Sequence, residues 1–550
     1  MSASPPNAPA STRPALLLCA ALTVLAGIQL HPFLTWDALA LAEHGLLIDD
    51  AFFYSTVAAK WLQHGFPTLD GEMSTNGFQP LWMLVHVGLA WLFPHADGAV
   101  TGSRLSWLLY VAFVAVTSWH VARRAAAPLW TLGGVAALVL VQPAFQRIVV
   151  RGLEVPLLLL LLSLMLVLVD RYRDRLGDTG SQGLFRVGVQ LGGLAGLIFL
   201  ARTDMFVVAV VVLGWLGLRQ RRLSGAIVGF CAACAVIVLP YLAWNYLTQQ
   251  GVMPISGRVK LHYMNVFLPT VADYFRSDEW QGSLAAFDVG LNLRVLPVPF
   301  ALRALLIAVL LLGGLAAMWA ARGSSRVPAS LKLLTGVVWI HLLVMHLVHR
   351  ELRPYTSYYF APALLWLGWV ATMSAATWLR SPGRWPRALP AALVSGAVVF
   401  VALGWTVNRV QPVPGWVERI ALARDIQRLV PASEKIAAFW PGCFAHFSGR
   451  DVVPSDGIIG SNAYFRDYVR TARELDYLAE KRVRYLAIRL FDGDYERITR
   501  PGPGSDPPRI RQWDNLGIQR LYDHRHLVRR TVAIRPLGDG GWFLFELATS

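Results

Sequence analysis

Residues 46–82 read LLIDDAFFYSTVAAKWLQHGFPTLDGEMSTNGFQPLW and join two apolar parts of the chain. The stretch begins with two adjacent carboxylates, Asp49 and Asp50, and continues into an amphipathic segment. The run before it, about residues 15–36, is long enough to cross a bilayer, because a membrane helix needs about 20 apolar residues. We therefore expect residues 46–82 to lie on one side of a membrane, directly after a first transmembrane helix.

The composition of the whole chain supports this membrane assignment. Of its 550 residues, 55% are hydrophobic and 15% are charged, whereas soluble domains carry about 25% charged residues. The net charge is +16, but Arg and Lys gather in short segments beside the apolar runs, as the positive-inside rule expects. A basic stripe typical of nucleic-acid binding is not visible. We expect a multi-pass protein surrounded by membrane lipids, with no nucleic-acid partner.

The basic clusters also predict how the chain crosses the membrane. Cytoplasmic loops carry an excess of Lys and Arg, so Arg13 and Arg123 mark inner ends. Residues 80–94 are short for a crossing and are expected to form a half-helix or an interfacial segment. Eleven crossings then place the N-terminus in the cytoplasm and the C-terminus outside. The predicted helices cover about residues 15–36, 105–124, 129–148, 155–170, 186–218 as a hairpin, 224–246, 299–320, 330–348, 357–379 and 388–409, with a long polar segment at 247–298.

Residues 411–550 have a different character. Their charge density is higher, and Pro412-Val413-Pro414-Gly415 is typical of a linker. The residue patterns predict strands at 483–490, 527–534 and 542–547 and a helix at 466–481. The expected fold class is mostly α: a polytopic helical membrane bundle in residues 1–410, followed by a soluble α/β domain in residues 411–550 on the outer side.

Polar residues from segments far apart in the sequence fall on the outer face under this topology. Ionisable residues at a membrane are costly and are candidates for function. Transfer from a phosphate-linked lipid needs a carboxylate that takes the proton of the attacking hydroxyl, and cations that stabilise the phosphate. The catalytic candidates are Asp49 and Asp50, and the substrate-binding candidates are Asn76, Glu154, Arg202, Asp204, Arg258, Lys260, His349, Arg350, Arg353 and Tyr355.

Several of these candidates also have a purely structural interpretation. Arg202 and Asp204 are expected to form a pair that ties a helical hairpin. Glu154 could cap the helix that follows it, because a carboxylate is favourable near a helix N-terminus. Arg258 and Lys260 could bind lipid headgroups only. The histidines do not show a spacing that demands a metal ion.

The order of these segments resembles the bacterial membrane glycosyltransferases of the GT-C fold, which use polyprenyl-phosphate sugars. The resemblance rests on residues 46–82, on RGLE at 151–154, LARTD at 200–204 and PISGRVK at 254–260, and on FSGRDVVPSDGIIGSNAY at 447–464. It implies an inverting transfer to an envelope glycan, lipid or protein acceptor at the periplasmic face of the bacterial inner membrane. By position it implies Asp49 as the base, with Asp50 as second choice. It leaves open the sugar and the assistance of a divalent cation, Mg²⁺ or Mn²⁺.

Two other classes of function stay open at this point. A transporter or flippase of a lipid-linked substrate would place charges at mid-membrane and use broken helices. His341 and the short apolar segment at Pro80 are the features that favour it. The third class is a non-catalytic membrane partner whose periplasmic part does the binding.

Overall fold

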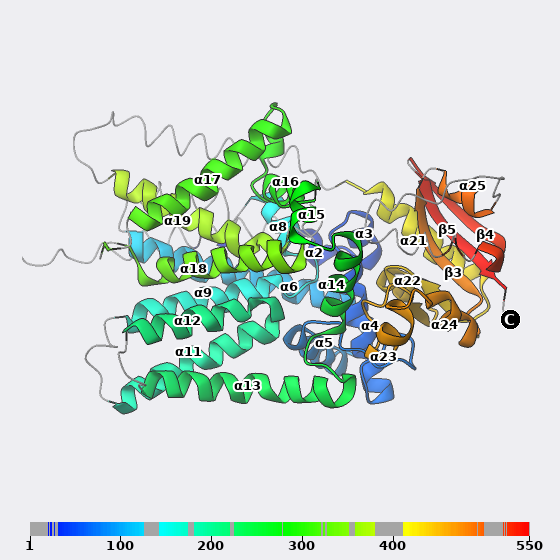
Figure 1. Cartoon of the computed structure of the whole chain (residues 1–550), viewed down its shortest axis with the longest axis horizontal. Coiled ribbons are helices and arrows are strands. Elements are labelled where there is room, and N and C mark those ends of the chain that lie inside the picture. The colour runs from blue at the N-terminus through cyan, green and yellow to red at the C-terminus, as the bar shows by residue number, and fades with distance from the viewer. Residues whose placement is uncertain are drawn as a thin grey trace, which may run out of the picture.

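The computed structural model describes residues 31–125, 142–173, 181–219, 225–277, 279–320, 327–350, 358–379, 411–491, 493–499, 525–538 and 540–548, with a few single positions between them. The predicted spans at 15–36, 129–148 and 388–409 lie wholly or largely outside these residues. The described part consists of a bundle of long helices with an α/β unit at one end (Figure 1). These two parts are called the bundle and the C-terminal unit (residues 411–548).

Six helices among the described residues are long and apolar enough to cross a membrane. They are α6 (Gly98–Ala125), α9 (Val155–Tyr172), α11 (Ser181–Ala201), α13 (Gly225–Gln249), α17 (Phe300–Ala320), and α18 (Ala329–Val344) with the following η3 (Met345–His349). Other apolar helices of the bundle are α5 (Pro80–Leu92), α12 (Phe206–Arg219) and α19 (Ala361–Leu379). The mostly helical membrane bundle is confirmed, whereas the count of eleven crossings stays a prediction.

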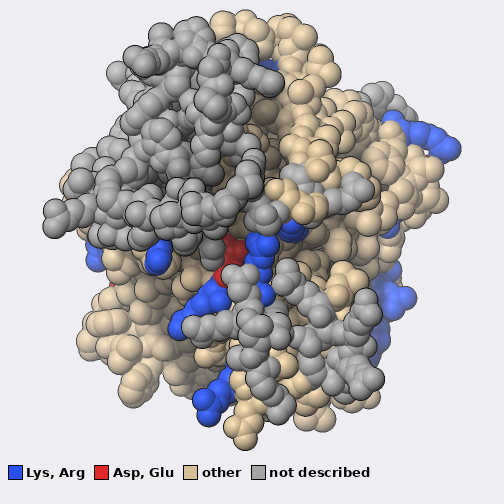
Figure 2. All heavy atoms as spheres, turned by 90° about the vertical axis from the view of Figure 1, so that its left-hand side faces the viewer, with Lys and Arg blue, Asp and Glu red and all other residues tan. Residues whose placement is uncertain are grey.

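The long helices alternate in direction along one axis of the molecule (Figure 1). The helices α9, α12 and α17 run away from the C-terminal unit, and α11, α13 and α18 run toward it, which agrees with the alternation that the basic clusters predicted. Figure 2 looks onto the end of the bundle that lies away from the C-terminal unit, where Lys and Arg side chains are spread and few Asp or Glu show. Arg171 lies in the last turn of α9, and Arg173 is the residue directly after that helix.

Small residues let two of the long helices approach each other closely. A Cβ added to Gly192 of α11 would overlap the backbone of Phe230 in α13, and one added to Gly188 would overlap the backbone of Ala226. Such close contacts between backbones stabilise membrane helix pairs by van der Waals packing, because lipid supplies little hydrophobic driving force between helices. The pair α11 and α13 therefore forms one rigid wall of the bundle.

Short helices form a layer between the bundle and the C-terminal unit (Figure 1). They are α3 (Ala38–Glu43), α4 (Asp49–His64), α14 (Ile255–Phe267), α15 (Val271–Arg276) and α16 (Gln281–Gly290). Helix α2 (His31–Thr35) precedes α3 in the chain, and α8 (Pro143–Val149) contacts α16. The polar segment predicted at 247–298 thus contains, among its described residues, the three α-helices α14, α15 and α16 and the 3-10 helix η2 (Leu293–Val295). Helix α4 ends at Gly65, whose φ of +78° is a left-handed conformation that glycine adopts without strain.

The C-terminal unit is built on a five-stranded sheet of order β2-β1-β3-β5-β4. Its strands are β1 (Ile436–Ala438), β2 (Val452–Pro454), β3 (Tyr485–Phe491), β4 (Val528–Leu537) and β5 (Gly540–Leu547). Strand β1 pairs in parallel with β2 and β3, while β5 pairs antiparallel with β3 and β4. The three predicted strands are present, and β1 and β2 escaped prediction because they are only three residues long.

Helices cover this sheet and connect it to the bundle. They are α21 (Pro414–Leu429), α22 (Pro441–Ser448), α23 (Asn462–Tyr464), η5 (Phe465–Val469), α24 (Glu474–Glu480), α25 (Asp494–Thr499) and η7 (Arg525–Leu527). The prediction of one helix at 466–481 is wrong, because the chain breaks between η5 and α24 at Ala472, where φ is +60°. The predicted linker runs directly into α21, whose first residue is Pro414.

Candidate active site

A cavity of about 250 Å³ lies where the bundle meets the C-terminal unit. We call it the polar cavity. It is lined by Ile48, Asp49, Asp50, Phe53, Arg151, Lys260 and Tyr358 from the bundle and by Trp416, Trp440, Pro441, Asp456, Ile458 and Ile459 from the C-terminal unit. The fold therefore brings three of the predicted site residues, Asp49, Asp50 and Lys260, to one place.

Asp49, the first choice for the base, is held by the C-terminal unit. Its carboxylate accepts the backbone N–H groups of Gly442 at 3.1 Å and Cys443 at 2.8 Å, and it forms an ion pair with Arg419. The two amides belong to the first turn of α22, where the helix dipole also favours a negative charge. A carboxylate with three such donors is engaged in holding two parts of the chain together.

Arg419 stands at the centre of this junction and is 2% exposed. Besides Asp49, its guanidinium group donates to the carbonyl oxygen of Trp440. Its guanidinium carbon lies 5.1 to 5.7 Å from four aromatic ring centres, a distance at which cation–π attraction contributes. The rings are those of Trp416, Trp440, Phe444 and Trp542. Asp49 and Arg419 thus fix the start of α4 against the C-terminal unit.

Asp50 differs from Asp49 in its surroundings, although the two are adjacent in α4. Successive residues of a helix point about 100° apart, and no described residue donates a hydrogen bond to the Asp50 carboxylate. Burial, which acts most strongly, raises the pKa of Asp50 to about 7, and the charges of Asp49, Glu154 and Asp456 add to the rise. The nearby Lys260 opposes it. A carboxylate with this pKa is a suitable general base near neutral pH.

Two cations border the polar cavity on the bundle side. Lys260 comes from α14, and its ammonium group lies 5.8 Å from the ring centre of Tyr359. Arg151 precedes α9, and its Nε donates to the carbonyl oxygen of Arg147 at 2.6 Å. Burial, which acts most strongly, lowers the pKa of Arg151 to about 10, so this side chain keeps its charge at neutral pH. The polar cavity therefore holds a basic carboxylate opposite positive charge.

A second cavity of about 380 Å³, here called the apolar cavity, lies on the other side of Lys260. Its lining is mostly apolar and includes Phe206, Val252 and Val348, which are 43%, 56% and 41% exposed. The polar members of its lining include Arg202, Asp204, Lys260 and His349. Lys260 is the residue that lines both cavities. Exposed apolar side chains at the rim of a membrane bundle face lipid, so this cavity has an apolar opening.

Arg202 is the centre of a buried ion network between α9, α11 and η1 (Thr203–Met205). Its Nη1 donates to Glu154 at 2.7 Å, and its Nε and Nη2 both donate to Asp204 at 3.1 Å. His341 completes the network at 3.1 Å from Asp204. The predicted tie between Arg202 and Asp204 is thus present. Glu154 is the N-cap residue of α9, as the structural interpretation expected, but its side chain makes no cap hydrogen bond and accepts from Arg202 instead.

Two predicted phosphate-binding arginines do not line either cavity. Arg258 donates to the side chain of Asn462 and lies 5.3 Å from the ring centre of Phe465. Arg350 donates to the carbonyl oxygen of Leu268 and to the side chain of Asn265. These contacts tie α14 to neighbouring segments and give both guanidinium groups a structural role.

The remaining predicted substrate-binding residues lie in different places. Asn76 donates to Asn245 at 3.0 Å and accepts the backbone N–H of Ile255 at 2.9 Å, so it fixes the loop before α5 against α13 and α14. His349 lines the apolar cavity. Arg353 and Tyr355 lie outside the described residues. The assignment of all these residues to a substrate stays a prediction.

Sequence reasoning missed the contribution of the C-terminal unit to the polar cavity. Asp456 is 2% exposed, and burial as the strongest effect raises its pKa to about 6. It accepts the backbone N–H groups of Trp440 at 3.1 Å and Ile458 at 3.0 Å. The segment PSDG that carries Asp456 lies in one of the stretches that carried the resemblance, but nothing in its spacing indicates which cavity it would reach.

Among the described residues, no group of three or more His, Cys, Asp or Glu side chains gathers as the ligands of a metal ion would. Assistance by Mg²⁺ or Mn²⁺ stays a prediction.

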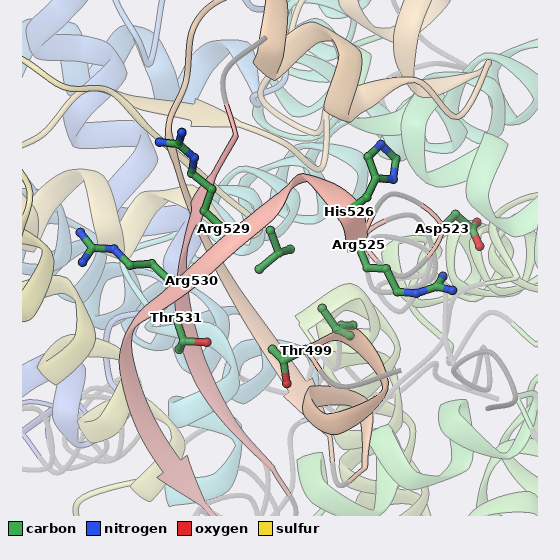
Figure 3. A pocket seen from close by; sticks show the side chains of 9 residues that line it. Thr499, Asp523, Arg525, His526, Arg529, Arg530 and Thr531 are labelled. Carbon is green, nitrogen blue, oxygen red and sulfur yellow. The ribbon is translucent and has the colours of Figure 1, made fainter. Parts of the chain in front are cut away.

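A third hollow of about 560 Å³ lies on the sheet of the C-terminal unit, between α25 and β4 (Figure 3). Its lining includes Arg525, Arg529 and Arg530, so it is basic. Figure 3 shows the guanidinium groups of Arg529 and Arg530 on one side of the hollow and that of Arg525 on the opposite side. Arg530 also donates to Glu546 at 2.7 Å. The positive charges therefore do not converge on one point inside it.

Comparison with known proteins adds to the description of the fold. No family model and no curated protein sequence matches the chain. Two similar solved structures are the oligosaccharyltransferase of Archaeoglobus fulgidus in complex with zinc and sulfate, and ArnT of Cupriavidus metallidurans in the apo state. The first protein is 14% identical to this chain, with a TM-score of 0.52, and the matched region covers 88% of this chain and 68% of the oligosaccharyltransferase chain. The second protein is 13% identical, with a TM-score of 0.49, and the matched region covers 96% of this chain and 97% of the ArnT chain. The likeness to the oligosaccharyltransferase shows that this chain has the GT-C fold of membrane glycosyltransferases.

Proposed function

We propose that the protein is a membrane glycosyltransferase that moves a sugar from a polyprenyl-phosphate donor to an acceptor hydroxyl, with Asp50 as the general base. The observation that carries the proposal is the pairing of the two cavities at Lys260. One cavity borders apolar side chains that are exposed at the rim of the bundle, and the other holds a carboxylate of raised pKa. A lipid-linked phosphate sugar needs both environments next to each other.

The proposed reaction assigns the proton to Asp50 instead of Asp49. The attacking acceptor oxygen forms a bond to the anomeric carbon while the bond from that carbon to the phosphate oxygen breaks. Asp50 takes the proton of the acceptor hydroxyl, and its pKa of about 7 suits this task at neutral pH. Asp49 is the poorer candidate, because Arg419 and two backbone amides occupy its oxygens.

Lys260 is proposed to hold the donor phosphate between the two cavities. The leaving phosphate gains negative charge as the sugar departs, and a positioned cation stabilises that charge. Lys260 suits this place because it lines both cavities and lies near Asp50. Arg151 would contribute a second positive charge from the wall of the polar cavity. The isoprenoid chain would extend through the apolar cavity toward the lipid.

The proposed orientation places the C-terminal unit in the periplasm of a bacterial inner membrane. Lys and Arg side chains are spread over the opposite end of the bundle (Figure 2), which is the distribution that cytoplasmic ends of membrane helices carry. The polar cavity then opens at the periplasmic surface, where a lipid-linked donor and an envelope acceptor can meet.

Consumption of a donor by purified protein tests this proposal. Wild type and the variant Asp50→Asn would be incubated in detergent with polyprenyl-phosphate sugars and a crude envelope acceptor, and released polyprenyl phosphate would be measured by mass spectrometry. We expect release by wild type and a loss of about 10² to 10⁴ in rate for the variant, the range for a general base. The partly exposed Asp273, which forms the capping box of α15 with Thr270 and lines neither cavity, provides the control Asp273→Asn. Full activity of Asp50→Asn would contradict the assignment of the base.

A transporter of a lipid-linked substrate is the second candidate. The buried network of Arg202, Glu154, Asp204 and His341 favours it, because ionisable groups inside a membrane bundle often mark a transport path. Turnover in detergent separates the two candidates, since detergent micelles have no second compartment to receive a transported substrate. Turnover there supports the transferase, and movement of donor across vesicles without turnover supports the transporter.

A further inference from the structure

The polar cavity has two chemically different walls. The bundle wall carries the cations Lys260 and Arg151 beside the acids Asp49 and Asp50, and Lys260 also borders the apolar cavity. The opposite wall belongs to the C-terminal unit and presents the indole rings of Trp416 and Trp440 and the carboxylate of Asp456. A lipid phosphate is attracted to Lys260 and Arg151 and repelled from Asp456. The second wall is therefore available to the other substrate.

The Asp456 carboxylate has unused hydrogen-bonding capacity on the cavity side. Among the described residues, Ile458 N–H bonds to Oδ1 at 3.0 Å and Trp440 N–H bonds to Oδ2 at 3.1 Å. A carboxylate oxygen offers two lone pairs, so each oxygen keeps one after these bonds. Asp456 is 2% exposed and lines the polar cavity, so a molecule bound in that cavity can reach the remaining lone pairs. Two adjacent acceptor positions suit two neighbouring hydroxyl groups.

The backbone of Trp440 is held in an unusual conformation at this wall. Its φ is +57°, in the left-handed region that residues with a side chain rarely adopt. Its N–H donates to Asp456, and its carbonyl oxygen accepts from Arg419, so contacts on both sides maintain the conformation. Backbone strain of this kind persists where the surroundings fix it and is concentrated at binding and catalytic sites. The contacts therefore keep the Trp440 ring at the edge of the cavity.

We infer that the C-terminal unit forms the acceptor subsite and that the acceptor is a neutral saccharide, bound by Trp416, Trp440 and Asp456. Indole rings pack against the apolar face of a sugar ring, and the carboxylate accepts its hydroxyl protons. The Asp456 carboxylate on this wall disfavours an acceptor that places a phosphate or carboxylate group against it. The volume of about 250 Å³ favours sugar-sized ligands over a folded peptide. This inference rests on the proposed function, since it names the molecule from which Asp50 takes the proton.

The test measures donor and acceptor dependence separately on the full-length protein. Wild type, Asp456→Asn, Trp416→Leu and the control Asp476→Asn would be assayed with the donor that wild type consumes. The acceptors would be p-nitrophenyl glucoside, mannoside and galactoside, the matched glucuronide, and a Ser/Thr peptide. Asp476 is an exposed residue of the same unit that pairs with Arg473, so its substitution should leave both KM values unchanged.

We expect wild type to glycosylate a neutral glycoside and to discriminate against the glucuronide and the peptide. Asp456→Asn and Trp416→Leu should each raise the KM for the acceptor about ten- to hundredfold, the effect of losing a charged hydrogen bond or a stacking surface. The KM for the donor should change much less. Because wild type alone is compared across the acceptors, this part of the test holds even if a variant fails to fold.

Two results would overturn the inference while leaving the proposed function intact. One is preferred transfer to the peptide or the glucuronide by wild type. The other is a rise in the donor KM, and not in the acceptor KM, for both variants, which would assign this wall to the sugar of the donor. No donor consumption by wild type under any condition would instead contradict the proposed function itself.

Discussion

Replacing Asp50 by Asn should stabilise the protein at alkaline pH although it removes the proposed base. Burial raises the pKa of Asp50 from 3.8 in the unfolded chain to about 7 in the folded protein. Below pH 3.8 the carboxyl group is protonated in both states. As the pH rises toward 7, the unfolded state releases the proton while the folded state retains it, so the folded state becomes progressively less stable. Asn carries no charge at any pH and avoids this penalty.

The size of the effect follows from the two pKa values. Each unit of difference corresponds to about 1.4 kcal/mol. The penalty on wild type is then about 1.5 kcal/mol at pH 5 and reaches about 4 kcal/mol at pH 8, above the folded pKa. The attraction to Lys260 is already contained in the pKa of Asp50, so it does not change the sum. The stability advantage of Asp50→Asn over wild type should therefore grow by about 2 to 3 kcal/mol between pH 5 and pH 8.

Thermal unfolding in detergent at pH 5 and pH 8 measures this advantage. Asp49→Asn serves as the matched comparison, because it alters the neighbouring carboxylate but breaks the ion pair with Arg419 and the bonds to Gly442 and Cys443. Loss of one partner of a buried ion pair costs about 3 to 5 kcal/mol, so this variant should be less stable than wild type at both pH values. An Asp50→Asn variant whose Tm differs from wild type by the same amount at pH 5 and pH 8 would refute the raised pKa of Asp50.

Three further predictions follow from the same contacts. The rate of donor consumption should rise about tenfold between pH 6 and pH 8, because the ionised fraction of a base with a pKa of about 7 rises from about a tenth to about nine tenths. A rate that stays constant over this range would contradict the assignment of Asp50 as the general base. Lys260→Ala should lower turnover, measured as released polyprenyl phosphate, about 10²- to 10³-fold, and Lys260→Arg should recover part of it. Equal rates for both variants and wild type would show that Lys260 does not hold the donor phosphate. Arg419→Met should lower the Tm and make α21 more susceptible to protease, because it leaves Asp49 without its buried partner. Unchanged protection of α21 would show that the junction does not depend on this pair.

The helical architecture could be predicted because its signals are local. Apolar runs and basic clusters predicted α9, α13 and α17 within a few residues of their observed bounds, and a short helix at Pro80 is present as α5. The helices inside residues 247–298 were missed because their apolar faces are short and are covered by tertiary contacts. The helix predicted at 466–481 failed because a single residue, Ala472, takes a positive φ that its side chain does not favour.

The candidate site was predictable in its general place but not in its detail. The sidedness of the polar segments located Asp49, Asp50 and Lys260, which do line one cavity. Which of the two acids is engaged depends on Arg419, which lies 370 residues from Asp49 along the chain. Sequence spacing carries no information on such a contact. The same reason hid Asp456, whose approach to the cavity results from the packing of α22 against α4.

The most direct test of the account compares the two adjacent acids in one assay. Release of polyprenyl phosphate from the donor would be followed over time with wild type, Asp50→Asn and Asp49→Asn at pH 8, below the Tm of each protein. We expect release by Asp50→Asn to be about 10²- to 10⁴-fold slower than by wild type and release by Asp49→Asn to be less affected, because the first removes the base and the second weakens the junction that positions it. Release by Asp50→Asn at the rate of wild type, with Asp49→Asn inactive but folded, would contradict the central claim and return Asp49 to the role of the base.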